Sequence, residues 1–166
     1  KMINSFFLKI FPFVFILFFI YFEFSPVYFF ENKLIKPFLA FSMVYCWICH
    51  DIGKFRPIWL LIFGLFYDFL QDGIIGVSAL FFLFIYHFQR KQSGNLLSFD
   101  FKETWVRFLL LLFFYVVCNY LINSLVEDFD YDLKKNFISF ILTVILFPMI
   151  FIIIEKITLR FKGYDE

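Results

Sequence analysis

Asp68 is the residue in this sequence whose type and setting most suggest chemistry. It interrupts an otherwise apolar run from Leu60 to Leu70. An ionised carboxylate in the hydrocarbon of a bilayer costs at least a few kcal/mol, so such a side chain must face protein or water. Asp68 therefore either handles a transported ion, proton or ligand, or ties neighbouring helices together. We favour the second role, because it needs only hydrogen-bond donors nearby.

Glycines at helical spacing around Asp68 indicate what it contacts. Gly64 lies one turn before Asp68 on the same helical face, where a small residue lets another helix approach closely. Gly73 and Gly76 follow in the next turn and at the start of the following apolar segment. The N–H groups at a helix start attract a carboxylate. The spacing therefore predicts that Asp68 bonds the backbone around Gly73 to Gly76.

The string Cys46-Trp47-Ile48-Cys49-His50 matches the c-type haem attachment pattern. Its position argues against haem, because the charge distribution described below places His50 at the cytoplasmic end of an apolar helix, whereas haem is attached outside that membrane. A structural zinc site needs four ligands, and these residues offer fewer. With Cys118 the cysteine count is odd, so we interpret all three as small apolar side chains and expect no cofactor and no metal.

Two classes of membrane enzyme share features with this sequence. Tyr67-Asp68 is similar to one half of an intramembrane aspartyl protease site, which needs a second carboxylate to share a proton. Asp72 belongs to the same turn, and Glu23 and Glu155 lie at segment ends, so no partner is expected. Lipoprotein signal peptidases are similar in length and hydrophobicity, but their aspartates occur in Asn- and Gly-rich boxes that this chain lacks. We expect no catalytic residue.

Two amides form the other polar pair within an apolar segment. Asn119 and Asn123 are four residues apart and lie on one helical face. Amides in lipid hydrogen-bond across helices for about 1 kcal/mol. We interpret both as packing residues.

The composition shows which solvent must surround these residues. The chain has 166 residues, of which 63% are apolar, 27% aromatic and only 17% charged, whereas soluble domains are about half apolar and a quarter charged. A soluble domain of this size leaves roughly a third of its unfolded surface in water, and 32 Phe residues cannot all be hidden. The composition predicts an integral membrane protein. The net charge of +1 gives no reason to expect a nucleic-acid partner.

Short polar stretches divide the chain into apolar segments of the kind that cross a bilayer, for which about 20 residues are needed. Pro37 suits the first turn of the second segment, and a kink is expected at Pro148. The third and fourth segments are short and form either a tight transmembrane hairpin or a re-entrant pair. The prediction is one all-α membrane domain, residues 1–166, with six transmembrane helices at about residues 6–24, 36–50, 57–70, 74–88, 105–126 and 137–154.

Lys and Arg residues are distributed unequally between alternate connections, which sets orientation through the positive-inside rule. With the N-terminus in the cytoplasm, eleven lie on the inner side: Lys1, Lys9, Lys54, Arg56, Arg90, Lys91, Lys102, Arg107, Lys156, Arg160 and Lys162. Four lie on the outer side: Lys33, Lys36, Lys134 and Lys135. Both termini are therefore expected in the cytoplasm, with the first segment retained as an anchor.

The order of these features resembles the MreD family of rod-shape-determining proteins. The resemblance lies in Lys36-Pro37 before a short second span and in a Gly64-x3-Asp68-x4-Gly73-x2-Gly76 hairpin, together with the length and the six-span hydropathy. The sequence departs from the family at Lys36, where Arg is frequent, and at Phe38, where a polar residue often follows the proline.

This resemblance implies a non-catalytic scaffold subunit of the bacterial elongasome, which directs cell shape and lateral peptidoglycan synthesis from the inner membrane. The implied partners are an MreC-like single-span protein, MreB-like filaments, a RodA glycosyltransferase and a penicillin-binding transpeptidase. The family is also similar in fold to the S-components of vitamin transporters. The alternative function is therefore a substrate-binding membrane subunit of a small-molecule transporter.

The orientation gives a first testable prediction. Tags fused to each end of the chain should react only from the cytoplasmic side of intact cells, because both ends lie on the side rich in Lys and Arg. The protein should also remain in the membrane fraction until detergent is added. A tag that reacts from outside, or recovery in the aqueous fraction, would contradict the predicted topology.

Overall fold

The described residues form a bundle of six helices. The computed structural model describes residues 2–25, 28–29, 32–33, 35–50, 53, 56–71, 74–92, 101–126 and 133–162. Two short antiparallel strands, β1 (Tyr28–Phe29) and β2 (Asn32–Lys33), lie between the first two helices. The helices are α1 (Met2–Phe24), α2 (Leu39–His50), α3 (Pro57–Gln71), α4 (Val77–Gln92), α5 (Phe101–Val126) and α6 (Leu133–Lys162).

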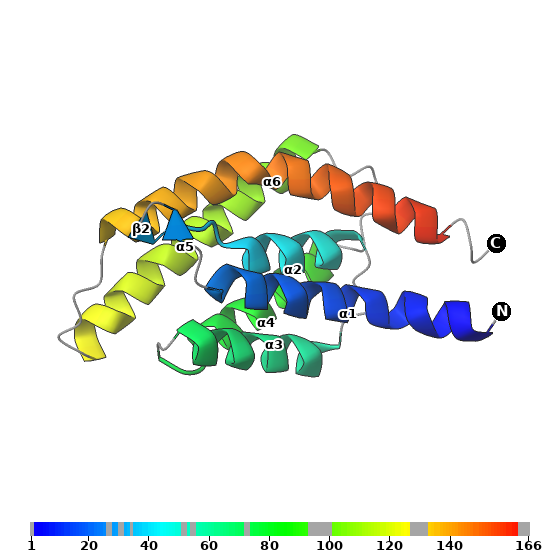
Figure 1. The fold of residues 1–166 in the computed structure, drawn as a ribbon, viewed down its shortest axis with the longest axis horizontal. Helices are drawn as coiled ribbons and strands as arrows, with labels where there is room; N and C mark the ends of the chain where they lie inside the picture. Colours follow the sequence, from blue (N-terminus) through cyan, green and yellow to red (C-terminus); the bar gives the residue numbers. More distant parts are fainter. Residues whose placement is uncertain are drawn as a thin grey trace.

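Successive helices run in opposite directions, so that their ends gather at two ends of the bundle (Figure 1). At one end, on the left of Figure 1, helices α1, α3 and α5 finish and α2, α4 and α6 begin. We call this the capped end. The start of α1 and the finish of α6 both lie at the opposite end.

Helix α2 lies at the centre of the core. Every residue from Ala40 to Cys49 is buried, and α2 contacts α1, α4, α5 and α6. A helix that is apolar on all sides is expected in such a position. Aromatic rings fill the space around it: the Phe41 and Tyr115 ring centroids are 4.1 Å apart, and Trp47 is 1% exposed.

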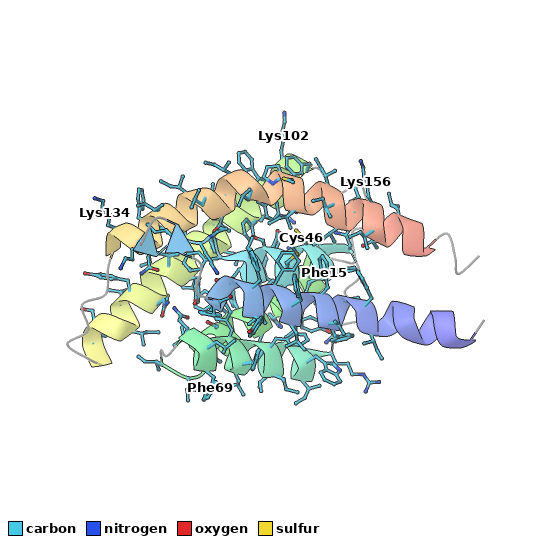
Figure 2. The ribbon with its side chains drawn as sticks, viewed as in Figure 1. Phe15, Cys46, Phe69, Lys102, Lys134 and Lys156 are labelled. Atoms are coloured by element: carbon cyan, nitrogen blue, oxygen red, sulfur yellow. The ribbon has the colours of Figure 1, made fainter. Side chains whose placement is uncertain are left out.

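The other five helices carry exposed apolar side chains on their outer faces. Figure 2 shows Phe69 of α3 pointing away from the bundle, and its side chain is 72% exposed. On α6 the exposed residues recur at helical spacing from Phe137 to Leu159, a stripe about 33 Å long at 1.5 Å per residue. This length is close to the thickness of a bilayer's hydrocarbon core, about 30 Å.

Two of the six helices are long and apolar enough to cross a membrane among the described residues. These stretches are Phe101–Ile122 of α5 and Lys134–Leu159 of α6. Helices α2, α3 and α4 have 12, 15 and 16 residues, fewer than the roughly 20 that a spanning helix needs. In α1 the apolar stretch among the described side chains is Ile10–Phe24.

Two predicted segments begin before the corresponding helices do. Helix α2 begins at Leu39 rather than at residue 36, so Pro37 precedes the helix instead of occupying its first turn. Proline disfavours a helical backbone at the residue before it, so Lys36 is a poor helix start. The Phe38 N–H, which precedes the helix, donates to Thr143 Oγ1 at 2.8 Å. Helix α4 begins at Val77 rather than Ile74, because Gly76 has a left-handed backbone with φ +108°.

Pro148 lies inside α6, which continues through it as an arched helix (Figure 1). Proline has no N–H, so the carbonyl of Val144 loses its usual helical partner. The indole Nε1 of Trp105 on α5 donates to that carbonyl at 3.4 Å. A side chain of the neighbouring helix α5 thus donates to the carbonyl that the proline leaves without its helical hydrogen bond.

Gly64 allows α3 and α4 to pack closely. A Cβ atom at this position would lie 2.2 Å from Ala79 Cα and 2.5 Å from Ala79 N. Both are backbone atoms of α4, which cannot move aside without shifting the whole helix. The position therefore requires glycine, and any larger side chain forces the two helices apart.

Substitution of Gly64 should destabilise the hairpin of α3 and α4. We expect Gly64→Ala to lower the free energy of unfolding by about 1–3 kcal/mol through overpacking, and Gly64→Leu to lower cellular accumulation as well. Thermal unfolding of the detergent-solubilised protein measures the first effect. Phe69→Leu, on the exposed face of the same helix, is the matched control and should melt like the parent. Unchanged stability of Gly64→Leu would disprove the close packing.

Candidate functional site

Asp68 is buried, with 2% of its surface exposed, and its carboxylate caps the start of α4. The Gly76 N–H donates to Oδ2 at 2.7 Å. The Ser78 N–H donates to both oxygens, at 3.0 Å for Oδ1 and 3.2 Å for Oδ2. These N–H groups have no acceptor within their own helix, and the Asp68 carboxylate of α3 provides one. The contact agrees with the position that the glycine spacing predicts.

Glu23 plays the same part for α2. Its Oε2 accepts a hydrogen bond from the Ala40 N–H at 2.9 Å. Its Oε1 accepts another from the Tyr67 hydroxyl at 2.7 Å. Glu23 thus joins the end of α1 to the start of α2 and, through Tyr67, to α3. Because Tyr67 and Asp68 are adjacent on α3, one helix end contributes to the capping of both α2 and α4.

Two further side chains contribute to the capping at this end. Thr143 of α6 accepts the hydrogen bond from Phe38 described above and donates its own hydroxyl to the Ser139 carbonyl at 2.6 Å. Lys36 donates its ammonium group to the carbonyls of Phe22, at 2.8 Å, and Ser25. Phe22 belongs to the last turn of α1 and Ser25 directly follows the helix, so the ammonium group lies at a helix C-terminus, where a cation is favourable.

Tyr115 brings α5 into the same arrangement. Its hydroxyl lies 3.0 Å from Ser78 Oγ on α4 and donates to Gln71 Oε1 on α3 at 3.4 Å. All six helices are therefore joined by polar side chains at or near the capped end. We call this set the polar layer, and it comprises Glu23, Lys36, Tyr67, Asp68, Gln71, Ser78, Tyr115 and Thr143.

The chemistry of the polar layer is that of hydrogen-bonded support. Two N–H donors, on Gly76 and Ser78, make three hydrogen bonds to the Asp68 carboxylate, and hydrogen bonds to a charged group are worth about 1.5–3 kcal/mol each. Among the described residues, no group of three His, Cys, Asp or Glu side chains is placed to hold a metal ion.

The other residues singled out from the sequence lie in different settings. Asn119 is buried in α5 and takes part in an interaction there. Asn123 belongs to the same helix, but its side chain lies outside the described residues, as does Gly73. Pro37 lies in the connection between Lys36 and α2, where its carbonyl accepts from the Leu39 N–H at 2.9 Å.

The haem-like string occupies the buried helix α2. Cys46 is fully buried and Cys49 is 8% exposed, and both are free thiols. Figure 2 shows Cys46 in the middle of the bundle. His50 Nδ1 lies 2.8 Å from the Cys46 carbonyl, one turn earlier in the helix. These residues therefore serve the packing of α2, as the interpretation of the cysteines as small apolar side chains requires.

Sequence reasoning missed Glu23, Tyr67 and Thr143 as members of the polar layer. Glu23 was predicted only to lie at the end of the first segment, and Tyr67 was considered only as part of the Tyr67-Asp68 pair. One signal was available. A lone carboxylate directly after an apolar segment and a lone threonine within one are both costly in lipid unless they are paired. Which groups they pair with depends on the arrangement of helices.

Loss of the Asp68 carboxylate should weaken the attachment of α4. Asp68→Ala leaves the N–H groups of Gly76 and Ser78 without an acceptor, which costs about 1–3 kcal/mol each when buried. We expect lower accumulation and a lower unfolding temperature in detergent. Asp68→Asn keeps one acceptor oxygen and should lose less.

Glu155→Ala is the control for the charge change, because Glu155 is an exposed carboxylate on α6. It should leave the unfolding temperature unchanged. Equal stability of Asp68→Ala and the parent protein would show that the cap contributes nothing.

Comparison of the chain with protein-family models, with curated proteins and with solved structures found no match.

Proposed function

We propose that this protein is a multi-pass protein of the bacterial inner membrane with six crossings and both termini in the cytoplasm. Three observations support this. The exposed apolar stripe on α6 is about as long as a bilayer core is thick. The start of α1 and the finish of α6 lie at the same end of the bundle (Figure 1). Eleven of the 15 Lys and Arg residues fall on one side of the predicted topology.

The short helices are compatible with this arrangement. Helix α2 has 12 residues, yet it is enclosed by other helices rather than exposed to lipid. Non-helical backbone at membrane depth is tolerated where protein satisfies its polar groups. In the segment before α2, Thr143 supplies such a partner by accepting from the Phe38 N–H. In Figure 2, Lys134 and Lys156 lie towards the two ends of α6, where cations reach the two membrane surfaces.

We propose further that the protein is a non-catalytic scaffold subunit of the kind that the MreD resemblance implies, serving cell shape and lateral wall synthesis. The observation that carries this proposal is the use of the polar layer. Buried Asp68 and half-buried Glu23 are the carboxylates on which chemistry could depend, and both accept hydrogen bonds from the chain's own backbone. Capping therefore accounts for the presence of these carboxylates. The outer faces of the bundle remain for contact with lipid and with other helices.

Those outer faces suit a partner that crosses the membrane once. Helix association within lipid depends on close packing and interhelical hydrogen bonds rather than on apolar burial. Five helices present exposed apolar side chains, with the longest runs on α5 and α6. A single transmembrane helix, as in an MreC-like protein, can pack against such a face.

Purification from membranes tests the scaffold proposal. The tagged protein, extracted in mild detergent, should recover an MreC-like single-span protein together with the glycosyltransferase and transpeptidase of wall synthesis. An unrelated six-helix membrane protein with the same tag is the control for non-specific recovery. Failure to enrich any of these partners over the control would count against the scaffold.

One observation favours the alternative, a substrate-binding subunit of a small-molecule transporter. A cavity of about 300 Å³ opens at the capped end, within the lower part of the range for ligand sites. The same purification discriminates the two functions, since a transport subunit should recover an ATPase module. The neighbouring reading frames offer a cheaper comparison: an MreC-like frame supports the scaffold, and a transporter ATPase supports transport.

A further inference from the structure

The cavity at the capped end has an unusual set of lining groups for a bundle so rich in phenylalanine. It lies between the end of α1, the segment before α2, the end of α3 and the start of α6. Its volume is about 300 Å³, room for about ten non-hydrogen atoms at roughly 30 Å³ each, the share of one water molecule. The lining residues are Glu23, Phe24, Ser25, Ile35, Lys36, Phe38, Tyr67, Gln71, Lys135, Asn136 and Ser139.

A fixed carboxylate forms one side of the cavity. Each Glu23 oxygen already accepts one hydrogen bond, from Ala40 or from Tyr67. A carboxylate has about four acceptor positions, so two bonds do not exhaust it. Because both bonds come from groups within the bundle, Glu23 is held in place before any ligand arrives. A carboxylate held in this way suits an ammonium group.

Positive charge also lines the cavity. Lys36 is half-buried and held against the last turn of α1, and Lys135 projects from the first turns of α6. Among the described lining residues, Lys36 and Lys135 are the cations and Glu23 is the anion, so an anionic group is favoured beside the lysines. Gln71, Asn136 and Ser139 add neutral hydrogen-bonding groups.

We propose that this cavity binds a small zwitterion, with its anionic group beside Lys36 and Lys135 and its ammonium group beside Glu23. The shared chemistry is that of a phosphate or carboxylate a few ångströms from an amine. It is found both in free molecules and in the phosphoethanolamine headgroup of a membrane lipid. The inference holds for a scaffold and for a transport subunit alike, and its failure would leave the recovery of partners untouched.

The test uses the full-length protein in detergent with three probes. These are glycerophosphoethanolamine, phosphatidylethanolamine, and glycerophosphoglycerol, which has the phosphate but no amine. The unfolding temperature should rise with the concentration of glycerophosphoethanolamine or of phosphatidylethanolamine, and should respond much less to glycerophosphoglycerol. Stabilisation by the soluble probe assigns the site to free zwitterions, and stabilisation by the lipid alone assigns it to a headgroup. Equal stabilisation by glycerophosphoglycerol, or no response to either zwitterion, would overturn the proposal.

Adjacent lysines provide matched variants. Lys135→Ala removes a cavity cation and should weaken binding at least about tenfold, since a hydrogen bond to a charged group is worth about 1.5–3 kcal/mol. Lys134→Ala makes the same change one position earlier, outside the cavity lining, and should bind like the parent. Equal loss in both variants would indicate only general attraction of anions and overturn the site. Glu23→Gln, where it folds, should abolish the preference for the zwitterion over glycerophosphoglycerol.

Discussion

The structure depends on one constraint: the backbone groups at the ends of its helices need partners in an apolar bundle. Each helix leaves four N–H groups at its start and four carbonyls at its end without internal partners. At the capped end, side chains of neighbouring helices supply some of them. Asp68 serves α4, Glu23 serves α2 and Lys36 serves α1. The polar residues therefore fix how the helices are joined, while the aromatic residues fill the space between them.

The separate roles of polar and aromatic residues account for the central position of α2. Its apolar surface is suited to burial on every side, yet a buried helix start must find hydrogen-bond acceptors within the protein. Glu23 from α1 and Thr143 from α6 provide them. The two helices that flank α2 in Figure 1 are thus the ones that cap it. Packing and capping select the same neighbours, which is the consistency expected of a well-specified fold.

Much of the helical pattern could be predicted from sequence, because it is local. Six helices occur where six apolar segments were expected, and the contact between Asp68 and Gly76 follows from a spacing of eight residues across one turn. The remaining contacts are not local. Glu23 bonds Tyr67 across 44 residues, and Thr143 bonds Phe38 across 105. No periodicity encodes such pairs.

The bond between Thr143 and Phe38 has a consequence for biosynthesis. Because the two residues are separated by 105 positions, this hydrogen bond at the entrance to the second helix cannot form until the sixth helix has been synthesised. Glu23, by contrast, is available as soon as the first two helices have been made. The Glu23–Ala40 hydrogen bond between the N-terminal helices can therefore form early, and the Thr143–Phe38 bond forms only after the last helix has been made. Until then the Phe38 N–H depends on other acceptors.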